Sequence, residues 1–195
     1  MTSMRQCKLI APSAVALVAF AWLTGSASAA VEDEAQNGFS VGESAEIGAP
    51  PDRVYAALVA PAHWWSSEHT YSQNAANLSL DARAGGCWCE TSPDGGSVQH
   101  LVVVNAIPGR LLRLRGPLGP LQGMAADGAM TISLHADGNN TRLTLAYAVG
   151  GYAKQGFGEL ANAVDSVLAE QTARLKRFVE TGSPESVQQP AKKGE

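Results

Sequence analysis

Two cysteines and a histidine are the residues of this sequence best suited to chemistry. Cys87 and Cys89 lie two positions apart in a stretch that predicts a strand, so both thiols point to the same face. The residues at 94–96, Asp-Gly-Gly, predict a hairpin turn. That turn would bring His100 across from Cys89 or Glu90, depending on the register.

Two thiolates and an imidazole would suit Zn²⁺ or Cu⁺, and His63 or His69 could supply a fourth ligand. A single C-x-C lacks the second pair that makes zinc motifs specific, so we expect no bound metal or cofactor and favour reduced, packed cysteines. A Cys87–Cys89 disulfide is the first alternative, because an oxidising compartment favours it. It would be strained on an extended strand, where these Cα atoms lie about 6.5–7 Å apart. Metal handling by Cys87, Cys89 and His100 is the second alternative.

Acid–base catalysis is a separate hypothesis for the same region. His100 could act as a general base in a cavity, with Tyr147 or Glu90 as its partner, as in a cyclase- or lyase-like enzyme. The sequence signals no Ser-His-Asp arrangement and no nucleophile elbow. We therefore favour a non-catalytic role.

A long amphipathic helix is the element that must position these groups. Residues 157–180 place apolar side chains on one side at helical spacing. These are Leu160, Val164, Val167, Leu168, Leu175 and Phe178. Gln171 interrupts the stripe near its centre, and a buried amide must find partners. A bond to a strand or a buried water and a contact to a ligand are equal alternatives for it.

The chain before this helix predicts seven short strands, with two short helices at about 51–60 and 62–66 after the first. The strands fall at 39–47, 78–80, 87–91, 98–107, 111–115, 130–135 and 141–149. Short turns between successive strands require antiparallel neighbours. The predicted fold class is α+β: a curved antiparallel sheet wrapped around the long helix.

The N-terminal residues 1–29 are typical of a secretory signal peptide. Arg5 and Lys8 precede an apolar run of about 15 residues, and an A-x-A site ends at Ala29. That run is short for a membrane span, which needs about 20 residues. We expect cleavage after Ala29, a periplasmic or secreted protein, and no stable membrane insertion afterwards. Residues 30–37 then predict a flexible leader, 38–182 the domain, and 183–195 a disordered tail.

Charge argues against nucleic acid as a partner. The chain has a formal net charge of −4, and removal of Arg5 and Lys8 with the signal peptide would change it to −6. An acidic chain lacks the basic surface that nucleic-acid binding needs.

Several local sequences resemble the START-like helix-grip fold of the SRPBCC superfamily. They are IGAPPDRVY at 47–55, Gly85-Gly86, IPGR at 107–110, and the helix from 164 to 178. The resemblance covers about residues 38–180. GPLGPLQG at 116–123 is similar to an exported bacterial subgroup of unassigned role, among polyketide cyclase/dehydratase-like and heat-shock-ATPase-activator-like relatives.

The resemblance implies a deep apolar cavity under the last helix that takes a hydrophobic small molecule or lipid-like ligand. The residues expected to contact this ligand are Gln171, Trp64, Trp65, Tyr147, His100, Leu121, Phe157 and Leu168. The glycine-rich segments 116–128 and 150–158 are the expected gates of the cavity.

Overall fold

A computed structural model describes residues 30–186 of the 195-residue chain. The expected signal peptide at 1–29 and residues 187–195 of the expected tail lie outside the described residues. The strands are β1 (Ala30–Ala35), β2 (Gly38–Ile47), β3 (Leu78–Leu80), β4 (Cys87–Thr91), β5 (Ser97–Ile107), β6 (Leu111–Arg115), β7 (Ala125–Asp137) and β8 (Asn140–Tyr152). The α-helices are α1 (Pro51–Leu58) and α2 (Gly158–Thr181).

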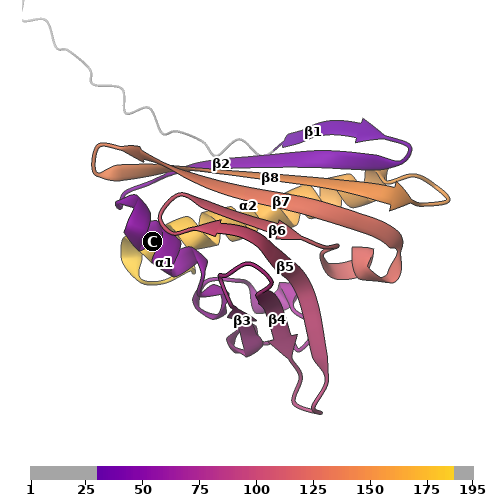
Figure 1. The fold of residues 1–195 in the computed structure, drawn as a ribbon, viewed down its shortest axis with the longest axis horizontal. Coiled ribbons are helices and arrows are strands. Elements are labelled where there is room, and N and C mark those ends of the chain that lie inside the picture. Colours follow the sequence, from indigo (N-terminus) through magenta and orange to yellow (C-terminus); the bar gives the residue numbers. More distant parts are fainter. Residues whose placement is uncertain (1–29, 187–195) are drawn as a thin grey trace, which may run out of the picture.

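All eight strands of the described residues form one antiparallel sheet in the order β1-β2-β8-β7-β6-β5-β4-β3. Figure 1 shows this sheet curving along α2. The α+β helix-grip prediction is thereby confirmed, with one more strand than the seven expected.

The additional strand is β1, which replaces the flexible leader expected at 30–37. Its acidic side chains at Glu32, Asp33 and Glu34 are exposed, so the sequence shows no apolar alternation there. The backbone nevertheless pairs with β2, because strand pairing needs only backbone N–H and C=O groups. Both faces of an edge strand can remain exposed to solvent.

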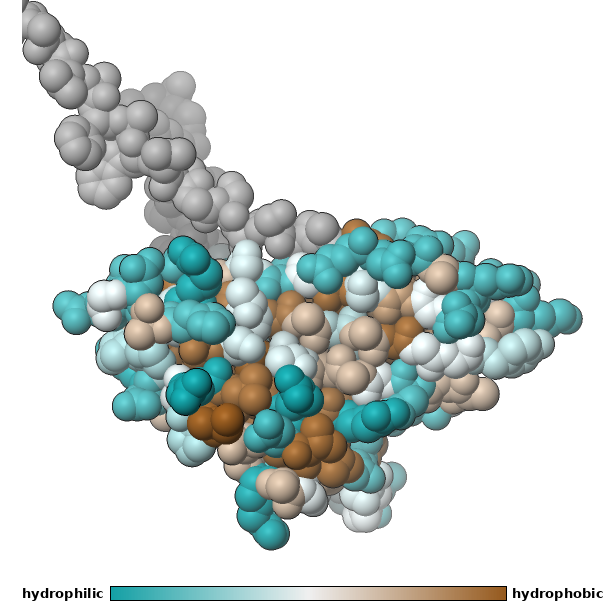
Figure 2. Space-filling view, turned by 45° about the horizontal axis from the view of Figure 1, so that its top comes forward, coloured by the Kyte–Doolittle hydropathy of each residue, from teal (hydrophilic) through white to brown (hydrophobic). Residues whose placement is uncertain are grey.

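The inner face of the sheet forms the core with α2. Phe39, Val41 and Ile47 on β2 are buried, as the alternation of the sequence predicts. Leu143, Leu145, Tyr147 and Val149 of β8 are buried in the same way, as are Met130, Ile132 and Leu134 of β7. Outside the core, large hydrophobic side chains reach the surface at Tyr71, Val104, Ile107 and Tyr152. Figure 2 shows hydrophobic residues gathered within an otherwise largely hydrophilic surface.

Helix α2 ends as its sequence predicts. Gly182 follows it in the left-handed conformation, with φ of 82°, and its N–H donates to the Phe178 carbonyl. Among residues 30–186, no helix is long and apolar enough to span a membrane.

The second short helix expected at 62–66 is instead a series of 3₁₀ turns. They lie at Pro61–His63, Ser67–His69 and Ala75–Asn77. Pro61 fixes the first turn but cannot continue α1, because it lacks the backbone N–H that an α-helix needs at that position. The resulting segment 61–77 connects α1 to β3, the short edge strand of the sheet.

The start of the expected disordered tail lies against α2. The Arg177 side chain donates to the Pro184 carbonyl at 2.7 Å, and Arg174 donates to Glu185 at 2.7 and 3.2 Å. Residues 183–185 are therefore held by two arginines of the helix.

Candidate ligand-binding site

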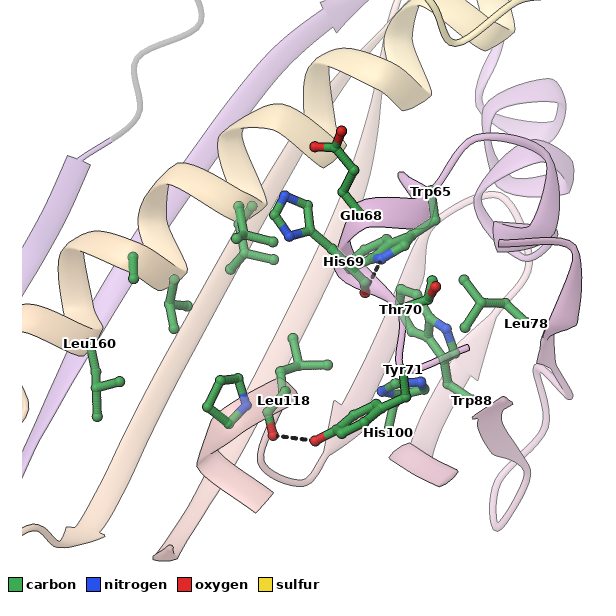
Figure 3. A pocket seen from close by; sticks show the side chains of 16 residues that line it. Trp65, Glu68, His69, Thr70, Tyr71, Leu78, Trp88, His100, Leu118 and Leu160 are labelled. Carbon is green, nitrogen blue, oxygen red and sulfur yellow. Dashed lines mark hydrogen bonds between the residues drawn. The ribbon is translucent and has the colours of Figure 1, made fainter. Parts of the chain in front are cut away.

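A cavity of about 440 Å³ lies between α2, the segment 65–71, the segment 118–120 and the strands β3 to β5. Figure 3 shows its lining side chains, which come from widely separated parts of the chain. They are Trp65, Glu68, His69, Thr70, Tyr71, Leu78, Trp88, His100, Leu118, Gly119, Pro120, Leu160, Ala163, Val164, Val167 and Leu168. We call this space the main cavity.

Helix α2 supplies one apolar wall of the main cavity. Leu160, Val164 and Val167 belong to the apolar stripe predicted from the sequence, yet they are only partly buried. They line the main cavity instead of packing fully against the sheet. Part of the helix stripe is therefore left uncovered by the fold, on the side where the cavity opens.

His100 forms part of the opposite wall, and a β-bulge places it there. Trp88 pairs with Leu101 and Cys89 pairs with Gln99, so His100 is left without a cross-strand partner. The bulge turns both His100 and its neighbour Leu101 inward, and both are buried. His100 thus lines the main cavity with its ring.

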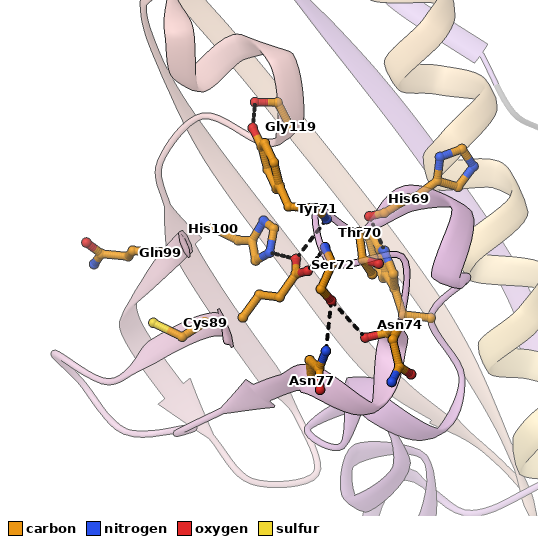
Figure 4. Close-up of polar contacts among 12 residues, drawn as sticks. His69, Thr70, Tyr71, Ser72, Asn74, Asn77, Cys89, Gln99, His100 and Gly119 are labelled. Carbon is orange, nitrogen blue, oxygen red and sulfur yellow. Dashed lines mark hydrogen bonds and ion pairs between the residues drawn. The ribbon is translucent and has the colours of Figure 1, made fainter. Parts of the chain in front are cut away.

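Glu90 on β4 holds the His100 ring from behind. The distance from His100 Nε2 to Glu90 Oε2 is 2.9 Å, and Glu90 is 0% exposed (Figure 4). The same carboxylate accepts the backbone N–H of Tyr71 at 3.1 Å and the backbone N–H of Ser72. Glu90 therefore ties the segment 65–72 to the sheet as well as orienting His100.

The hydrogen bonds keep Glu90 ionised despite its burial. Burial alone would raise the pKa of this carboxyl, but the bonds from Ser72, Tyr71 and His100 outweigh it and hold the pKa below its usual value. The site thus contains a buried carboxylate that acts as an acceptor to three neighbours.

Two polar contacts lie at the edge of the main cavity. His69 Nε2 and Glu170 Oε2 are 3.0 Å apart and link the segment 65–71 to α2. The Tyr71 hydroxyl donates to the Gly119 carbonyl at 2.9 Å, so Tyr71 connects that segment to the 119–123 turn (Figure 3). Both contacts join elements that are separate in the sequence.

Three of the eight predicted ligand contacts line the main cavity: Trp65, His100 and Leu168. The segment predicted as a gate at 116–128 also contributes to the wall, through Leu118, Gly119 and Pro120. The other five predicted residues lie elsewhere.

Gln171 does not face the main cavity. Its Oε1 accepts the backbone N–H of Ser66 at 2.8 Å, and its Nε2 has no partner among the described residues. Gln171 and Trp64 instead line a void of about 20 Å³ deeper in the core. The Trp64 indole N–H donates to the Ala57 carbonyl at 2.9 Å. Gln171 is one turn of α2 beyond Leu168, which turns its amide toward the 61–66 segment and away from the opening.

Tyr147 of β8 and Leu121 both hold the segment 116–124 in place and do not line the main cavity. The Tyr147 hydroxyl donates to the Gly116 carbonyl at 2.9 Å and accepts the Leu118 N–H at 3.0 Å. Burial raises the pKa of Tyr147 to about 12. Leu121 is 0% exposed because the 3₁₀ turn directs it into the core while its neighbours reach the cavity. Of the two acid–base partners considered for His100, Tyr147 is bonded elsewhere and only Glu90 contacts the ring.

Phe157 packs at the start of α2, with its ring 5.9 Å from that of Phe39. It borders a separate, open hollow of about 760 Å³ that Lys154, Gln155 and Glu159 also line. Apolar residues such as Met124 and Leu160 line this hollow as well, so its lining is mixed and less apolar than that of the main cavity.

Cys87 and Cys89 form a disulfide, which corrects the favoured interpretation of two reduced thiols. The two Cα atoms are 5.4 Å apart, closer than the distance of about 6.5–7 Å expected of an extended strand. In Figure 4, Cys89 points away from His100, whose ring faces Glu90. The metal set of Cys87, Cys89 and His100 is therefore not assembled, and no cluster of three such ligands occurs within residues 30–186.

Sequence reasoning missed a buried carboxyl group, Glu43, that lies near the partly buried Asp165. Glu43 on β2 is 3% exposed, and no described residue donates a hydrogen bond to its carboxylate. Burial first, then the charge and hydrogen bonding of Asp165 on α2, raise the pKa of Glu43 to about 7. The signal was present, because Glu43 shares the parity of the buried residues Val41 and Ala45. Leu118 lies in the segment 116–128 that was expected as a gate, whereas Glu68 and Thr70 of the cavity lining had no such signal.

Comparison with known proteins identifies the family. Residues 38–180 match the family described as "Polyketide cyclase / dehydrase and lipid transport". The chain belongs to this family. No protein of curated function matches the chain.

Solved structures share the fold at low sequence identity. CalU16 from Micromonospora echinospora is 17% identical with a TM-score of 0.54, covering 82% of this chain and 86% of CalU16. EF2215 from Enterococcus faecalis is 16% identical with a TM-score of 0.53, covering 83% of this chain and 82% of EF2215. DynU16, from the dynemicin biosynthetic locus, is 21% identical with a TM-score of 0.52, covering 74% of this chain and 48% of DynU16. At these identities the likeness concerns the fold alone.

Proposed function

We propose that this protein is an exported, non-catalytic binding protein for a hydrophobic small molecule or lipid-like ligand held in the main cavity. The observation that carries the proposal is the apolar wall of α2 at Leu160, Val164 and Val167, which the fold leaves partly uncovered beside about 440 Å³ of space. Cavities of this size and lining suit small organic ligands. Burial of apolar surface contributes about 25 cal/mol per Å², which is enough for micromolar affinity with few polar contacts.

A fluorescence titration with the neutral probe N-phenyl-1-naphthylamine tests this function. Trp65 and Trp88 line the main cavity, so their emission reports occupancy directly. In Val164→Trp the larger side chain fills part of the cavity from the side of α2. The dissociation constant of the probe should rise at least about tenfold, because the probe loses apolar contacts. Ser166→Trp is the matched control, because Ser166 is exposed on the same helix.

The proposal requires saturable binding to the wild type and to Ser166→Trp, with comparable dissociation constants. It fails if the wild type does not bind, or if Val164→Trp binds as tightly as the control. Circular dichroism and thermal melts of all three proteins establish that any loss arises in a folded protein.

Export is the second part of the proposal. The eight described strands all follow the expected cleavage point at Ala29, so a chain that starts at Ala30 would contain every one of them. Intact-mass measurement of protein from the periplasmic fraction should give a chain that starts at Ala30. A full-length chain retained in the cytoplasm would contradict export.

A cyclase- or lyase-like enzyme is the second candidate, and the Glu90–His100 contact favours it. A carboxylate behind a cavity-lining imidazole is an arrangement that can orient a general base. The two functions differ in the fate of the ligand. Incubation with ligand extracted from the protein should return it unchanged if the protein only binds, whereas conversion that depends on His100 would establish an enzyme.

A further inference from the structure

The polar groups of the main cavity are mostly committed to neighbours within the protein. Trp65 Nε1 donates to the His69 carbonyl at 3.0 Å, and the Thr70 hydroxyl donates to the Ser67 carbonyl at 2.8 Å. The Tyr71 hydroxyl donates to Gly119. These groups have little left to offer a ligand.

His100 is different, because its second nitrogen is uncommitted. Nε2 lies against Glu90, while Nδ1 makes no hydrogen bond to any residue between 30 and 186. His100 is 7% exposed and lines the main cavity. Nδ1 is not among the fully buried side-chain atoms that lack a partner, so it keeps accessible surface and is open to a partner that enters the cavity.

The surroundings of Glu90 determine what Nδ1 can do. Two backbone N–H groups, from Tyr71 and Ser72, point at this carboxylate and can only donate. Glu90 is therefore set up as an acceptor, and His100 Nε2 must be the donor in their contact. In a neutral imidazole whose Nε2 carries the proton, Nδ1 has a free lone pair and accepts a hydrogen bond.

Trp88 adds a donor to the same cavity. It is 3% exposed, and its indole nitrogen makes no hydrogen bond within the described part of the chain. An acceptor and a donor in one apolar cavity match a hydroxyl group, which both donates and accepts. Three carboxylates, Glu68 and Glu170 at the edge and Glu90 behind His100, disfavour an anionic ligand instead.

We propose that the ligand is a neutral hydrophobic alcohol or phenol whose hydroxyl donates to His100 Nδ1 while its apolar part lies along α2. This inference rests on the proposed binding function and assigns a ligand class to it. His100 is the specificity-determining residue. Its contact with Glu90 makes Nε2 the donor and leaves Nδ1 as the acceptor.

Binding of 2-naphthol and 2-methoxynaphthalene tests the inference, since the two differ in the hydroxyl proton. The wild type should bind 2-naphthol at least about tenfold more tightly, which corresponds to one well-formed hydrogen bond in a buried site. His100→Leu should bring the ratio close to one while keeping the affinity for 2-methoxynaphthalene within about threefold. Equal affinities in the wild type would overturn the inference and leave the binding function standing. Failure of the wild type to bind either compound would overturn the binding function itself.

A measurement on the wild type makes the test independent of how His100→Leu folds. The ¹⁵N spectrum of the His100 ring should show an unprotonated Nδ1 at neutral pH. Its signal should move when 2-naphthol is added and stay in place with 2-methoxynaphthalene. A protonated Nδ1, or a signal that both compounds leave unchanged, would refute the assignment.

Discussion

Glu43 gives the most quantitative prediction of the structure. It is buried between β2 and α2, where Asp165 provides a second carboxyl group and no described residue donates to either Glu43 oxygen. When protonated, Glu43 can donate to Asp165; when charged, it has no donor and faces a like charge. The charged form is therefore disfavoured, and the pKa of Glu43 rises from 4.5 to about 7.

The sign and size of the effect follow from proton linkage. Below pH 4.5 Glu43 is protonated in both the folded and the unfolded chain, and burial of the neutral group costs little. Between pH 4.5 and about 7 the folded state keeps a proton that the unfolded state has released, so the free energy of unfolding falls as pH rises. The total loss is roughly 3 kcal/mol, at about 1.36 kcal/mol per pH unit. For a domain of this size that corresponds to roughly 6–12 °C in Tm.

Urea and thermal unfolding of the wild type and Glu43→Gln between pH 4.5 and 8.5 measure this directly. The stability advantage of Glu43→Gln over the wild type should grow by roughly 3 kcal/mol across the range. Glu46→Gln is the matched control, because Glu46 lies on the same strand but is exposed and paired with Arg142. Its difference from the wild type should stay within about 1 kcal/mol. Parallel curves for the wild type and Glu43→Gln would refute the reasoning.

Three further substitutions test the other buried polar groups. Glu90→Gln should lower the free energy of unfolding by roughly 2–3 kcal/mol at pH 7, because it removes a charged acceptor. Since the pKa of Glu90 is held below 4.5 in the folded state, this loss should shrink as acid protonates the wild-type group, and a pH-independent loss would contradict it. Tyr147→Phe should cost about 1–3 kcal/mol and speed hydrogen exchange at the Leu118 amide, whereas unchanged exchange would show that the hydroxyl does not hold that loop. Gln171→Leu should cost about 1–2 kcal/mol by leaving the Ser66 N–H unpaired, with N-phenyl-1-naphthylamine affinity kept within about threefold. A large loss of affinity for the probe without loss of stability would instead indicate that Gln171 contacts the ligand.

The fold could be predicted because its determinants are periodic. Leu143, Leu145 and Tyr147 alternate on β8, and Leu168 and Leu175 recur at helical spacing on α2, so strand and helix are both visible in the sequence. The edge strand β1 could not be predicted. Its pairing with β2 depends on backbone groups, and its exposed acidic side chains carry no apolar signal.

The site was harder to predict because it depends on single-residue geometry. One bulge at His100 determines the inward direction of that ring. Sequence spacing alone cannot reveal a bulge. Similarly, Gln171 lies on the predicted side of α2, but one helical turn separates it from the part of that side that faces the main cavity.

The partners of polar groups across the fold were also hidden from the sequence. Tyr147 was expected among the ligand contacts because it belongs to the inner face of β8, which is correct. Its hydroxyl contacts the backbone of residues 116 and 118. These residues belong to the connection between β6 and β7, whose sequence has no periodic pattern. Loop conformations of this kind place Tyr71 and Leu118 in the cavity wall.

Methyl NMR tests directly whether the main cavity under α2 is the ligand site. With N-phenyl-1-naphthylamine added, the methyl signals of Leu118, Val164 and Val167 should shift and saturate together, because these side chains line the main cavity. The methyl signals of Val41 and Leu143, which are buried in the core away from that lining, should stay in place. Saturable binding that leaves the three cavity residues unchanged, or no binding, would contradict the account.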